Sequence, residues 1–190
     1  DKVIDLDPGM AFGSGTHETT GMCISLLEEI IAGHESVIDV GTGSGILSII
    51  AMLLGAGRVF ATDIDPNAVS AAEENTCMNH IDEEKCRFAV GDIISDEAFR
   101  ERCGRAGYDL VLANILADVI IPLSSVIAYN MKPGGIFVSS GILNTKEDDV
   151  RAALLANDFE IIETTYSGDW VAFTCRRNHA AFFCQQRSDR

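Results

Sequence analysis

Short apolar runs alternate with longer segments of helical periodicity along most of this chain. Between positions 19 and 32, for example, apolar side chains recur at the spacing of one helix face. Strands that alternate with helices form βαβ units, so the pattern predicts a parallel sheet with helices on both faces. The expected strands are 36–40, 58–62, 87–90, 108–113 and 136–140, and the expected helices are 19–32, 46–54, 66–79, 117–129 and 146–156.

Two further strands, 160–166 and 170–176, are separated only by a short turn at Gly168-Asp169. No crossover helix fits between them, so they are expected to form an antiparallel hairpin at one edge of the sheet. Another strong turn, the Lys-Pro-Gly-Gly run at 132–135, is expected before the fifth strand. The prediction is an α/β fold with a mostly parallel, seven-stranded sheet, in which ligands bind beyond the carboxyl ends of the strands.

The most informative motif follows the first predicted strand, where Gly41, Gly43 and Gly45 alternate with small polar residues before an apolar helix. A glycine turn lets a ligand lie against bare backbone, and the helix that follows it supplies free N–H groups. The second strand leads into Asp63, where an acid can bind the two hydroxyls of a ribose. The combination predicts a nucleoside-binding pocket.

The identity of the nucleoside depends on the glycine spacing and on Asp39, which precedes the turn. A dinucleotide site has G-x-G-x-x-G, whereas this chain has G-x-G-x-G with Ile46 at the third glycine position. The Asp39 carboxylate would repel a pyrophosphate but could accept a hydrogen bond from an ammonium group or a water. S-adenosylmethionine carries a ribose, an ammonium group and no phosphate, so it fits best. A glycine turn that binds nothing is the alternative, which Asp39 and Asp63 together disfavour.

The composition limits the number of domains and the kinds of partner that can be expected. At 190 residues and 47% hydrophobic content, the chain can bury one good core and fits one domain. It has 14 basic and 29 acidic residues and a formal charge of −15, which disfavours nucleic-acid binding by this chain alone. The charge suits a basic partner, or it serves only solubility.

The cysteines and the two ends of the chain indicate the expected cellular compartment and the limits of the domain. Six cysteines show no C-x-x-C pair and no zinc spacing, so no metal site is predicted and a reduced, cytoplasmic protein is expected. No apolar run has the length of a membrane span, and no signal peptide is visible. The first residue is Asp1 rather than methionine, as expected of a fragment. Residues 1–177 are interpreted as one domain, and 178–190, which lack a clear period, as a disordered or expression-derived tail.

Several motifs together resemble the class I S-adenosylmethionine-dependent methyltransferases, and in particular the PrmA family, the bacterial methyltransferases of ribosomal protein L-eleven. The resemblance covers about Asp5 to Arg176. The glycine turn is generic to the class, whereas the loop from Phe12 to Thr20 and the run Asn114-Ile115-Leu116-Ala117 are specific. The segments that carry the resemblance are 7–20, 37–47, 63–66 and 113–117.

The resemblance implies S-adenosylmethionine as the cofactor and a Rossmann-like class I methyltransferase fold. Gly41 would lie beside the amino-acid part of the cofactor, and Asp63 would bind its ribose. Asp92 and Ile93 match the position beside the adenine, and Asn114 would lie near the methyl group. The full set of expected cofactor contacts is Phe12, Thr16, Thr20, Asp39, Gly41, Gly43, Gly45, Asp63, Ile64, Asp92, Ile93 and Asn114.

The signature loop departs mildly from the family pattern. Ser14 stands where threonine is usual, and Glu18 stands where proline is frequent. Thr20 in the same loop would close over the cofactor. The family's N-terminal domain, which presents the ribosomal protein, is missing from this chain, so cofactor binding is expected to survive and substrate recognition is not.

The implied reaction is methyl transfer from a sulfonium to lysine ε-amines and an N-terminal α-amine of the ribosomal protein. Transfer is an in-line displacement, so the site must align amine, methyl and sulfur and exclude water. The nucleophile is a neutral amine, and Asn114 could accept from it through its side-chain oxygen. A capping role at the strand-to-helix turn is the alternative for Asn114. His17 could take a proton, but a single histidine is weak evidence for a base, so it is interpreted as ordering the loop by hydrogen bonding and no general base emerges.

Two other functions stay open. One is a methyltransferase for another nucleophile, such as a glutamine amide, a nucleobase or a small molecule. Amide and adenine methylators typically carry Asn-Pro-Pro-Tyr or Asp-Pro-Pro-Tyr, and both are weakened because the run that starts at Asn114 has no aromatic residue. The other is a non-catalytic nucleotide-binding scaffold, which is disfavoured because the glycines and acids of the pocket are all in place.

Overall fold

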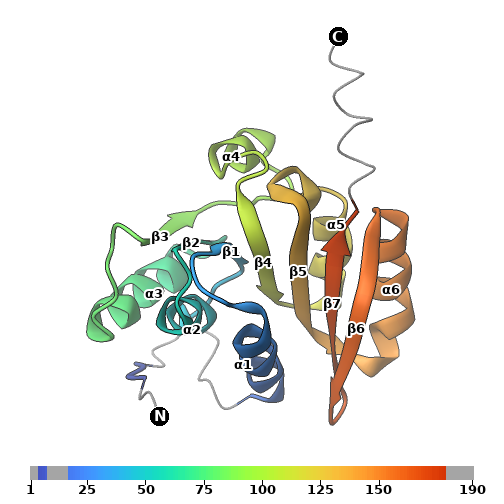
Figure 1. The fold of residues 1–190 in the computed structure, drawn as a ribbon, viewed down its shortest axis with the longest axis horizontal. Helices are drawn as coiled ribbons and strands as arrows, with labels where there is room; N and C mark the ends of the chain where they lie inside the picture. Colours follow the sequence, from blue (N-terminus) through green and yellow to red (C-terminus); the bar gives the residue numbers. More distant parts are fainter. Residues whose placement is uncertain (1–3, 8–16, 179–190) are drawn as a thin grey trace.

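The computed structural model of the protein describes residues 4–7 and 17–178 (Figure 1). The strands within these residues are β1 (Ser36–Val40), β2 (Arg58–Asp63), β3 (Cys86–Val90), β4 (Tyr108–Asn114), β5 (Met131–Leu143), β6 (Phe159–Ser167) and β7 (Trp170–Arg177). The α-helices are α1 (Glu18–Ile30), α2 (Ile46–Leu54), α3 (Pro66–Met78), α4 (Glu97–Arg102), α5 (Ala117–Ser124) and α6 (Glu147–Ala156), and two short 3-10 helices are η1 (Ile127–Tyr129) and η2 (Asn144–Lys146). Of the expected tail, residues 179–190 lie outside the described residues.

The described strands form one seven-stranded sheet in the order β3-β2-β1-β4-β5-β7-β6 (Figure 1). Strands β1 to β5 run parallel, and β7 pairs antiparallel with both β5 and β6. This arrangement confirms the predicted sheet, including the hairpin of β6 and β7 at one edge. The strand order reverses between β1 and β4, so the switch point of the sheet lies between these two strands.

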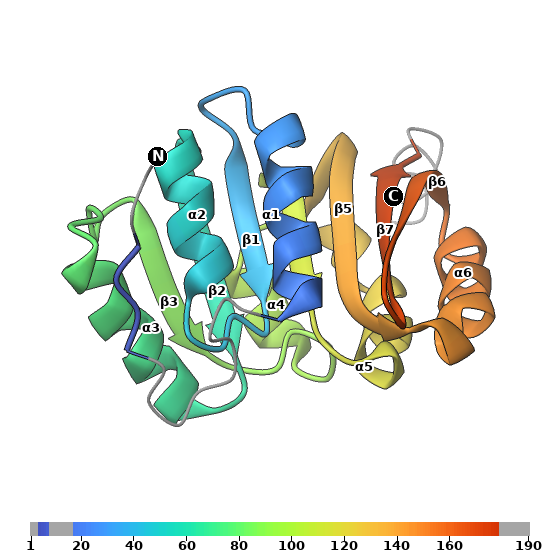
Figure 2. The ribbon, with the colours of Figure 1, turned by 90° about the horizontal axis from the view of Figure 1, so that it is seen from below.

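Helices cover both faces of the sheet (Figures 1 and 2). α1 and α2 pack on one face, where they share a core with Val37 of β1 and Leu112 of β4. α5 and α6 pack on the other face, against Ile38 of β1 and Val111 of β4. Successive strand residues point to opposite faces, so a strand that is covered on both sides is apolar almost throughout. For this reason the central strands are recognisable as short apolar runs.

The helices of the structure differ from the prediction in two places. α4 was not expected, because it has only six residues, of which Phe99 alone is buried, and so short a segment shows no apolar periodicity. The helix is stabilised by Asp96, whose side chain caps it by accepting from the Phe99 N–H at 2.9 Å. The helix expected at 117–129 ends at Ser124, and η1 follows separately. Pro122 removes a helical hydrogen bond, and the Ser124 and Ser125 hydroxyls donate to carbonyls three residues back.

The start of β5 also differs from the prediction. The turn expected at 132–135 lies inside this strand rather than before it. Tyr108 pairs with Met131 and Leu110 pairs with Ile136, so the intervening residues of β5 form a bulge. Gly134 has a φ of 77° within the bulge, a backbone conformation that favours glycine.

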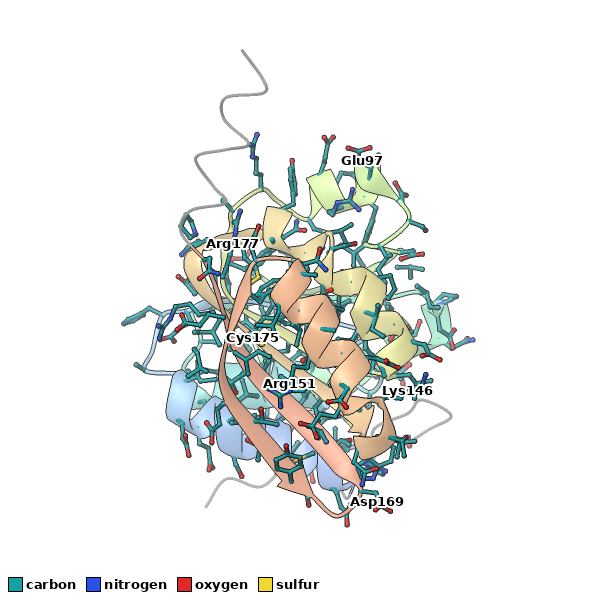
Figure 3. All side chains as sticks on the ribbon, turned by 90° about the vertical axis from the view of Figure 1, so that its right-hand side faces the viewer. Glu97, Lys146, Arg151, Asp169, Cys175 and Arg177 are labelled. Atoms are coloured by element: carbon teal, nitrogen blue, oxygen red, sulfur yellow. The ribbon has the colours of Figure 1, made fainter. Side chains whose placement is uncertain are left out.

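Arg151 of α6 fastens this helix to the edge hairpin (Figure 3). Its guanidinium pairs with Glu147 at 2.7 Å and donates to the Thr164 hydroxyl of β6 at 3.2 Å. It also lies 5.0 Å from the ring centroid of Phe173 in β7. One side chain therefore contacts both strands of the hairpin.

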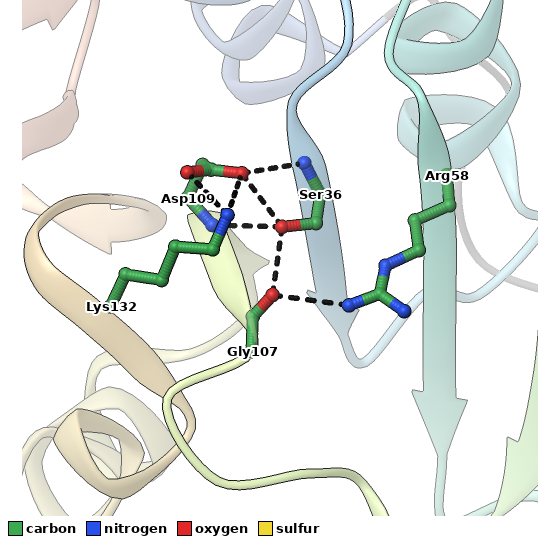
Figure 4. Close-up of polar contacts among 5 residues, drawn as sticks. All are labelled: Ser36, Arg58, Gly107, Asp109 and Lys132. Atoms are coloured by element: carbon green, nitrogen blue, oxygen red, sulfur yellow. Dashed lines mark hydrogen bonds and ion pairs between the residues drawn. The ribbon is translucent and has the colours of Figure 1, made fainter.

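A polar cluster joins the amino ends of four strands (Figure 4). Lys132 Nζ lies 2.8 Å from both carboxylate oxygens of Asp109, and the Ser36 N–H donates to the same carboxylate at 2.9 Å. Burial raises the pKa of Asp109, but these hydrogen bonds outweigh burial and hold the pKa below its usual value. Arg58 donates to the Gly107 carbonyl at 3.2 Å. The cluster thus ties β1, β2, β4 and β5 together at the edge opposite to the predicted pocket.

Candidate functional site

A cavity of about 460 Å³ opens beyond the carboxyl ends of β1, β2, β3 and β4. It lies at the switch point of the sheet, where the strand order predicts a ligand. Gly41, Asp63, Asp92 and Asn114, which end or follow these strands, all lie on its wall. The described residues that line it are His17, Thr19, Thr20, Asp39, Val40, Gly41, Thr42, Gly43, Ile46, Leu47, Thr62, Asp63, Ile64, Gly91, Asp92, Ile93, Ile94, Asn114, Ile115, Leu116, Val119, Gly141 and Trp170.

The structure brings most of the predicted cofactor contacts together in this cavity. Phe12 and Thr16 lie outside the described residues. Among the others, only Gly45 is absent from the wall. A Cβ at Gly45 would lie 2.9 Å from the Cβ of Ala72 in α3, so this glycine lets α3 pack closely against the turn. Gly45 therefore shapes the turn without facing the cavity.

The glycine turn presents bare backbone to the cavity. Gly41 and Gly43 have φ values of 74° and 56°, in the left-handed region that glycine adopts easily. The Gly41 N–H donates to the Thr62 carbonyl at 2.8 Å, which holds the turn against β2. A Cβ at Gly41 would lie 2.5 Å from Cγ2 of Ile115. Space as well as backbone conformation therefore requires glycine at this position.

Asp63 ends β2 beside this turn. Its Oδ2 accepts from the Gly43 N–H and its Oδ1 from the Asp65 N–H, each at 3.0 Å. These two hydrogen bonds fix the orientation of the carboxylate at the cavity wall. A carboxylate oxygen has more than one acceptor site, so both oxygens can still accept from the hydroxyls of a ligand.

Asp39 lies beneath the turn and is 1% exposed. Its Oδ2 accepts from the hydroxyls of Thr42 and Ser48, both at 2.7 Å. Burial raises the pKa of Asp39 to about 6, although the two hydroxyls oppose this effect, and the nearby Asp63 carboxylate raises it further. Ser48 belongs to α2, so the carboxylate ties the turn to this helix while it lines the cavity.

Asp92, Ile93 and Ile64 form another part of the wall. The hydrogen bond from the Ser95 hydroxyl, at 2.5 Å, lowers the pKa of Asp92, and the Ile94 N–H donates to the same carboxylate at 2.9 Å. Asp92 therefore caps the turn after β3, and its role beside an adenine stays a prediction. Ile93 is buried, whereas Ile64 is 73% exposed at the cavity and offers apolar surface to a flat ring.

Asn114 at the end of β4 contacts the start of α1. Its amide nitrogen donates to the Thr20 hydroxyl at 3.4 Å, so the amide oxygen is the group that can accept from a ligand amine. The alternative that Asn114 caps the helix after β4 is wrong, because the N-cap residue of α5 is Leu116 and no side chain forms a capping hydrogen bond there. His17 is the N-cap of α1, and its Nδ1 accepts from the Thr19 N–H at 3.3 Å. His17 thus caps the helix that follows the loop, and its ordering of the loop itself stays a prediction because residues 8–16 lie outside the described residues.

Several apolar residues of the wall were not among the expected contacts, and Trp170, Leu116 and Val119 are three of them. Trp170 at the start of β7 makes an edge-on contact with His17, with 5.0 Å between ring centroids. The signals for Trp170 were weak: it is the only tryptophan of the chain, and it directly follows the hairpin turn. Leu116 and Val119 are 68% and 39% exposed, and both lie on the cavity wall. Exposed apolar side chains beside a cavity mark a binding surface, but exposure is not visible in the sequence.

The described cysteines do not contribute to the cavity. Cys23, Cys86, Cys103 and Cys175 are buried, as expected of small core residues, and burial raises the pKa of the Cys23 thiol to about 12.

Within residues 4–7 and 17–178, no three His, Cys, Asp or Glu side chains are grouped as a metal ion would require. No helix in this described part has the length and apolar character needed to cross a membrane.

Comparison with known proteins reveals close relatives. A sequence profile for the family described as ribosomal protein L11 methyltransferase (PrmA) matches residues 1–178. The chain is similar to a curated Lachnospira eligens protein named ribosomal protein L11 methyltransferase, with 48% identity over 176 residues that cover 92% of this chain and 55% of that protein. The chain thus spans about half the length of the curated relatives it matches.

Solved structures share the fold. A ribosomal protein L11 methylase from Lactobacillus delbrueckii subsp. bulgaricus has a TM-score of 0.82 and 34% identity, covering 94% of this chain and 86% of that chain. P. horikoshii TYW2 in complex with MeSAdo has a TM-score of 0.69 and 16% identity, covering 85% and 63%. The second likeness bears on the fold alone. Together they confirm the expected Rossmann-like class I methyltransferase fold.

Proposed function

This chain belongs to the ribosomal protein L11 methyltransferase (PrmA) family, and we propose that it binds S-adenosylmethionine and methylates amines of a ribosomal protein. The proposed domain is residues 1–177. The proposed targets are lysine ε-amines and an N-terminal α-amine, in a substrate of the L11 type that a separate N-terminal domain presents. A ribosomal-protein substrate implies that the reaction takes place in the cytoplasm.

The observation that carries the proposal is the position of the Asp63 carboxylate beside the bare backbone of Gly41 and Gly43. A ribose presents two neighbouring hydroxyls, and an oriented carboxylate can accept from both. The amino-acid arm of the cofactor needs a backbone without side chains, and Gly41 and Gly43 present such a backbone at the cavity wall. The residues present therefore fit S-adenosylmethionine.

The charges around the cavity favour this ligand over a dinucleotide. Asp39, Asp63 and Asp92 line the cavity, and the described wall contains no Lys or Arg. Three carboxylates without a basic partner repel a pyrophosphate and attract a ligand that carries ammonium and sulfonium groups. Charge also favours the proposed substrate, because a chain with a formal charge of −15 attracts a basic ribosomal protein.

When bound, S-adenosylmethionine supplies an electrophilic methyl group on its sulfonium. The residues of the chain then have to place an amine in line with that methyl group and keep water away. Asn114 accepts a hydrogen bond from the amine through Oδ1, because Thr20 occupies its amide nitrogen. Leu116, Val119 and Trp170 line the same cavity and give the amine an apolar environment. Desolvation there favours the neutral form of the amine, which is the nucleophile.

Ligand binding is tested by calorimetry with S-adenosylmethionine, S-adenosylhomocysteine and NAD. The proposal expects the first two to bind and NAD not to bind. A preference for NAD would remove the methyltransferase function from consideration.

Transfer is tested with purified ribosomal proteins and S-adenosylmethionine labelled in its methyl group. The chain is used alone and joined to the N-terminal part of a relative such as the Lachnospira eligens protein, and mass spectrometry locates the label. Label on lysine and N-terminal amines is expected with the longer protein. Label only on glutamine amides, on nucleic acid or on a small molecule would favour the other methyltransferase class instead.

A further inference from the structure

Residues 4–7, here called the strap, lie along α3 although about seventy residues separate the two in sequence (Figure 2). The Asp5 N–H donates to Oδ1 of Asn79 at 3.0 Å, and Nδ2 of Asn79 donates to the Asp5 carbonyl at 2.6 Å. Asn75 pairs with Asp7 in the same way, at 2.9 Å and 3.4 Å. Two asparagine side chains therefore bind the backbone of the strap as a neighbouring strand would.

The spacing of the two asparagines explains why an extended segment fits on a helix. Residues four apart on a helix are separated by about 6 Å along its axis. Residues two apart in an extended segment are separated by about 6.6 Å, so Asn79 and Asn75 meet Asp5 and Asp7 in register. The strap runs antiparallel to α3, and it therefore leads from Asn79 toward the end of α3 that adjoins the cavity.

Asn75 makes one contact that Asn79 does not make. It is 1% exposed, and its Nδ2 also donates to the Ser44 carbonyl at 2.8 Å. Ser44 lies between Gly43 and Gly45 in the glycine turn. The corresponding nitrogen of Asn79 donates instead to the Asn75 carbonyl within α3, at 2.8 Å. Asn75 thus joins three segments, namely the strap, α3 and the turn that lines the cavity.

We propose that Asn75 is a positioning residue for the glycine turn, and that it couples the strap to ligand binding in the cavity. Asn75 holds the turn from outside through the Ser44 carbonyl, while Asp63 holds it from the cavity side through the Gly43 N–H at 3.0 Å. A turn fixed on both sides presents its backbone to the ligand without further ordering. Coupling between two sites is reciprocal, so a bound ligand tightens the strap on α3. The identity of that ligand rests on the proposed function.

Two matched substitutions test the coupling. Asn75→Asp keeps an acceptor for the Asp7 N–H, but it loses the donor and sets a carboxylate against the Ser44 carbonyl. Asn79→Asp makes the same change one helical turn away, where the glycine turn is not contacted. By calorimetry with S-adenosylhomocysteine, Asn75→Asp should raise Kd about tenfold and Asn79→Asp less than about threefold. Equal losses in the two variants would overturn the positioning role of Asn75, because the loosened strap would then account for both.

Hydrogen exchange provides a second readout that needs no ligand. The Gly43 and Gly45 amides are hydrogen-bonded in the turn, to Asp63 and to the Thr42 carbonyl. Their exchange should be about tenfold faster in Asn75→Asp and unchanged in Asn79→Asp. Unchanged exchange in both variants would refute the positioning role. If no variant and no wild-type protein bound S-adenosylhomocysteine, the proposed ligand would be wrong, while the exchange rates would still decide the role of Asn75. Asn75→Ser, which is too short to reach Ser44, replaces Asn75→Asp if that variant does not fold.

Discussion

Replacing Asp39 by asparagine separates the effect of its buried carboxylate on stability from its effect on ligand binding. The side chain lies under the glycine turn and accepts from Thr42 and Ser48. Asparagine has the same shape, and its Oδ1 can accept from both hydroxyls. The substitution therefore removes the charge and leaves most of the packing in place.

The expected gain in stability follows from the pKa of Asp39, which burial raises from 3.8 to about 6. The folded state then holds the proton more tightly than the unfolded state, so stability falls as the pH rises from 3.8 to about 6 and stays constant above. At about 1.36 kcal/mol per pH unit, the loss is about 3 kcal/mol. The asparagine variant does not ionise and avoids this loss. Its two new N–H groups cost about 1 kcal/mol each if unpaired, so a net gain of about 1 kcal/mol is expected at pH 8.

Urea unfolding of both proteins from about pH 4 to about pH 8 measures this gain. The difference between wild type and Asp39→Asn should grow up to about pH 6 and then level off. Asp109→Asn is the matched control, because the pKa of Asp109 is held below its usual value and the sign reverses. Its carboxylate stabilises the folded state above that usual value and loses this contribution as the pH falls, so Asp109→Asn should destabilise at neutral pH. A variant Asp39→Asn that is less stable than wild type at pH 8, or a difference that does not vary with pH, would show that the buried charge does not lower stability.

The same variant should bind its ligand more weakly, because Asp39 lines the cavity and its charge attracts a cationic ligand. A loss of about tenfold in affinity for S-adenosylmethionine is expected by calorimetry. A carboxylate that costs stability and improves binding is typical of functional sites. Unchanged affinity would show that Asp39 serves only to hold the turn.

Three further substitutions test other parts of the site. Asp63→Ala should weaken S-adenosylhomocysteine binding about 100-fold by calorimetry, because two charge-assisted hydrogen bonds are lost, and an affinity close to wild type would contradict its ribose role. Asn114→Ala should leave cofactor affinity within about threefold and slow label transfer by the longer protein about 10-fold or more, whereas unaltered turnover would refute its role in orienting the amine. Gly41→Ala places a Cβ 2.5 Å from Ile115 at a φ of 74°, so Tm should fall by about 5 °C or more. Gly21→Ala is the control, because Gly21 lies in α1 and a Cβ there would have no neighbouring atom within 4 Å, so Tm should rise slightly. Equal Tm values for the two variants would show that position 41 does not require glycine.

Much of the site could be predicted because its main residues stand next to short-range signals. Gly41 and Asp63 follow apolar strands directly, and parallel strands carry their carboxyl ends to one edge of the sheet. A one-dimensional pattern is therefore enough to bring these residues together. The limits of β1 and α2 were predicted to the residue for the same reason, since a buried strand and a glycine-bounded helix have sharp signals.

Other parts of the site depend on contacts between segments that are distant in sequence. Trp170 reaches the cavity only because β7 inserts between β5 and β6 and starts at the carboxyl edge of the parallel strands. Asn114 meets Thr20 only because the start of α1 lies beside the end of β4, 94 positions further along the chain. The pairing of Asn75 with Asp7 requires α3 to lie beside a segment that precedes it by 68 positions.

The chain's own order of apolar runs, glycines and acids determined the parallel sheet, its terminal hairpin and the edge at which a nucleoside is expected. These features follow from local backbone preference and from the alternation of buried strands with helices, both of which are visible in one dimension. Only the tertiary structure decided which groups donate hydrogen bonds to Asp39 and Asp63, which apolar residues complete the wall, and how Asn75 links the strap to the glycine turn. Hydrogen bonds and burial between distant segments depend on distances in space, and no periodicity along the chain encodes them.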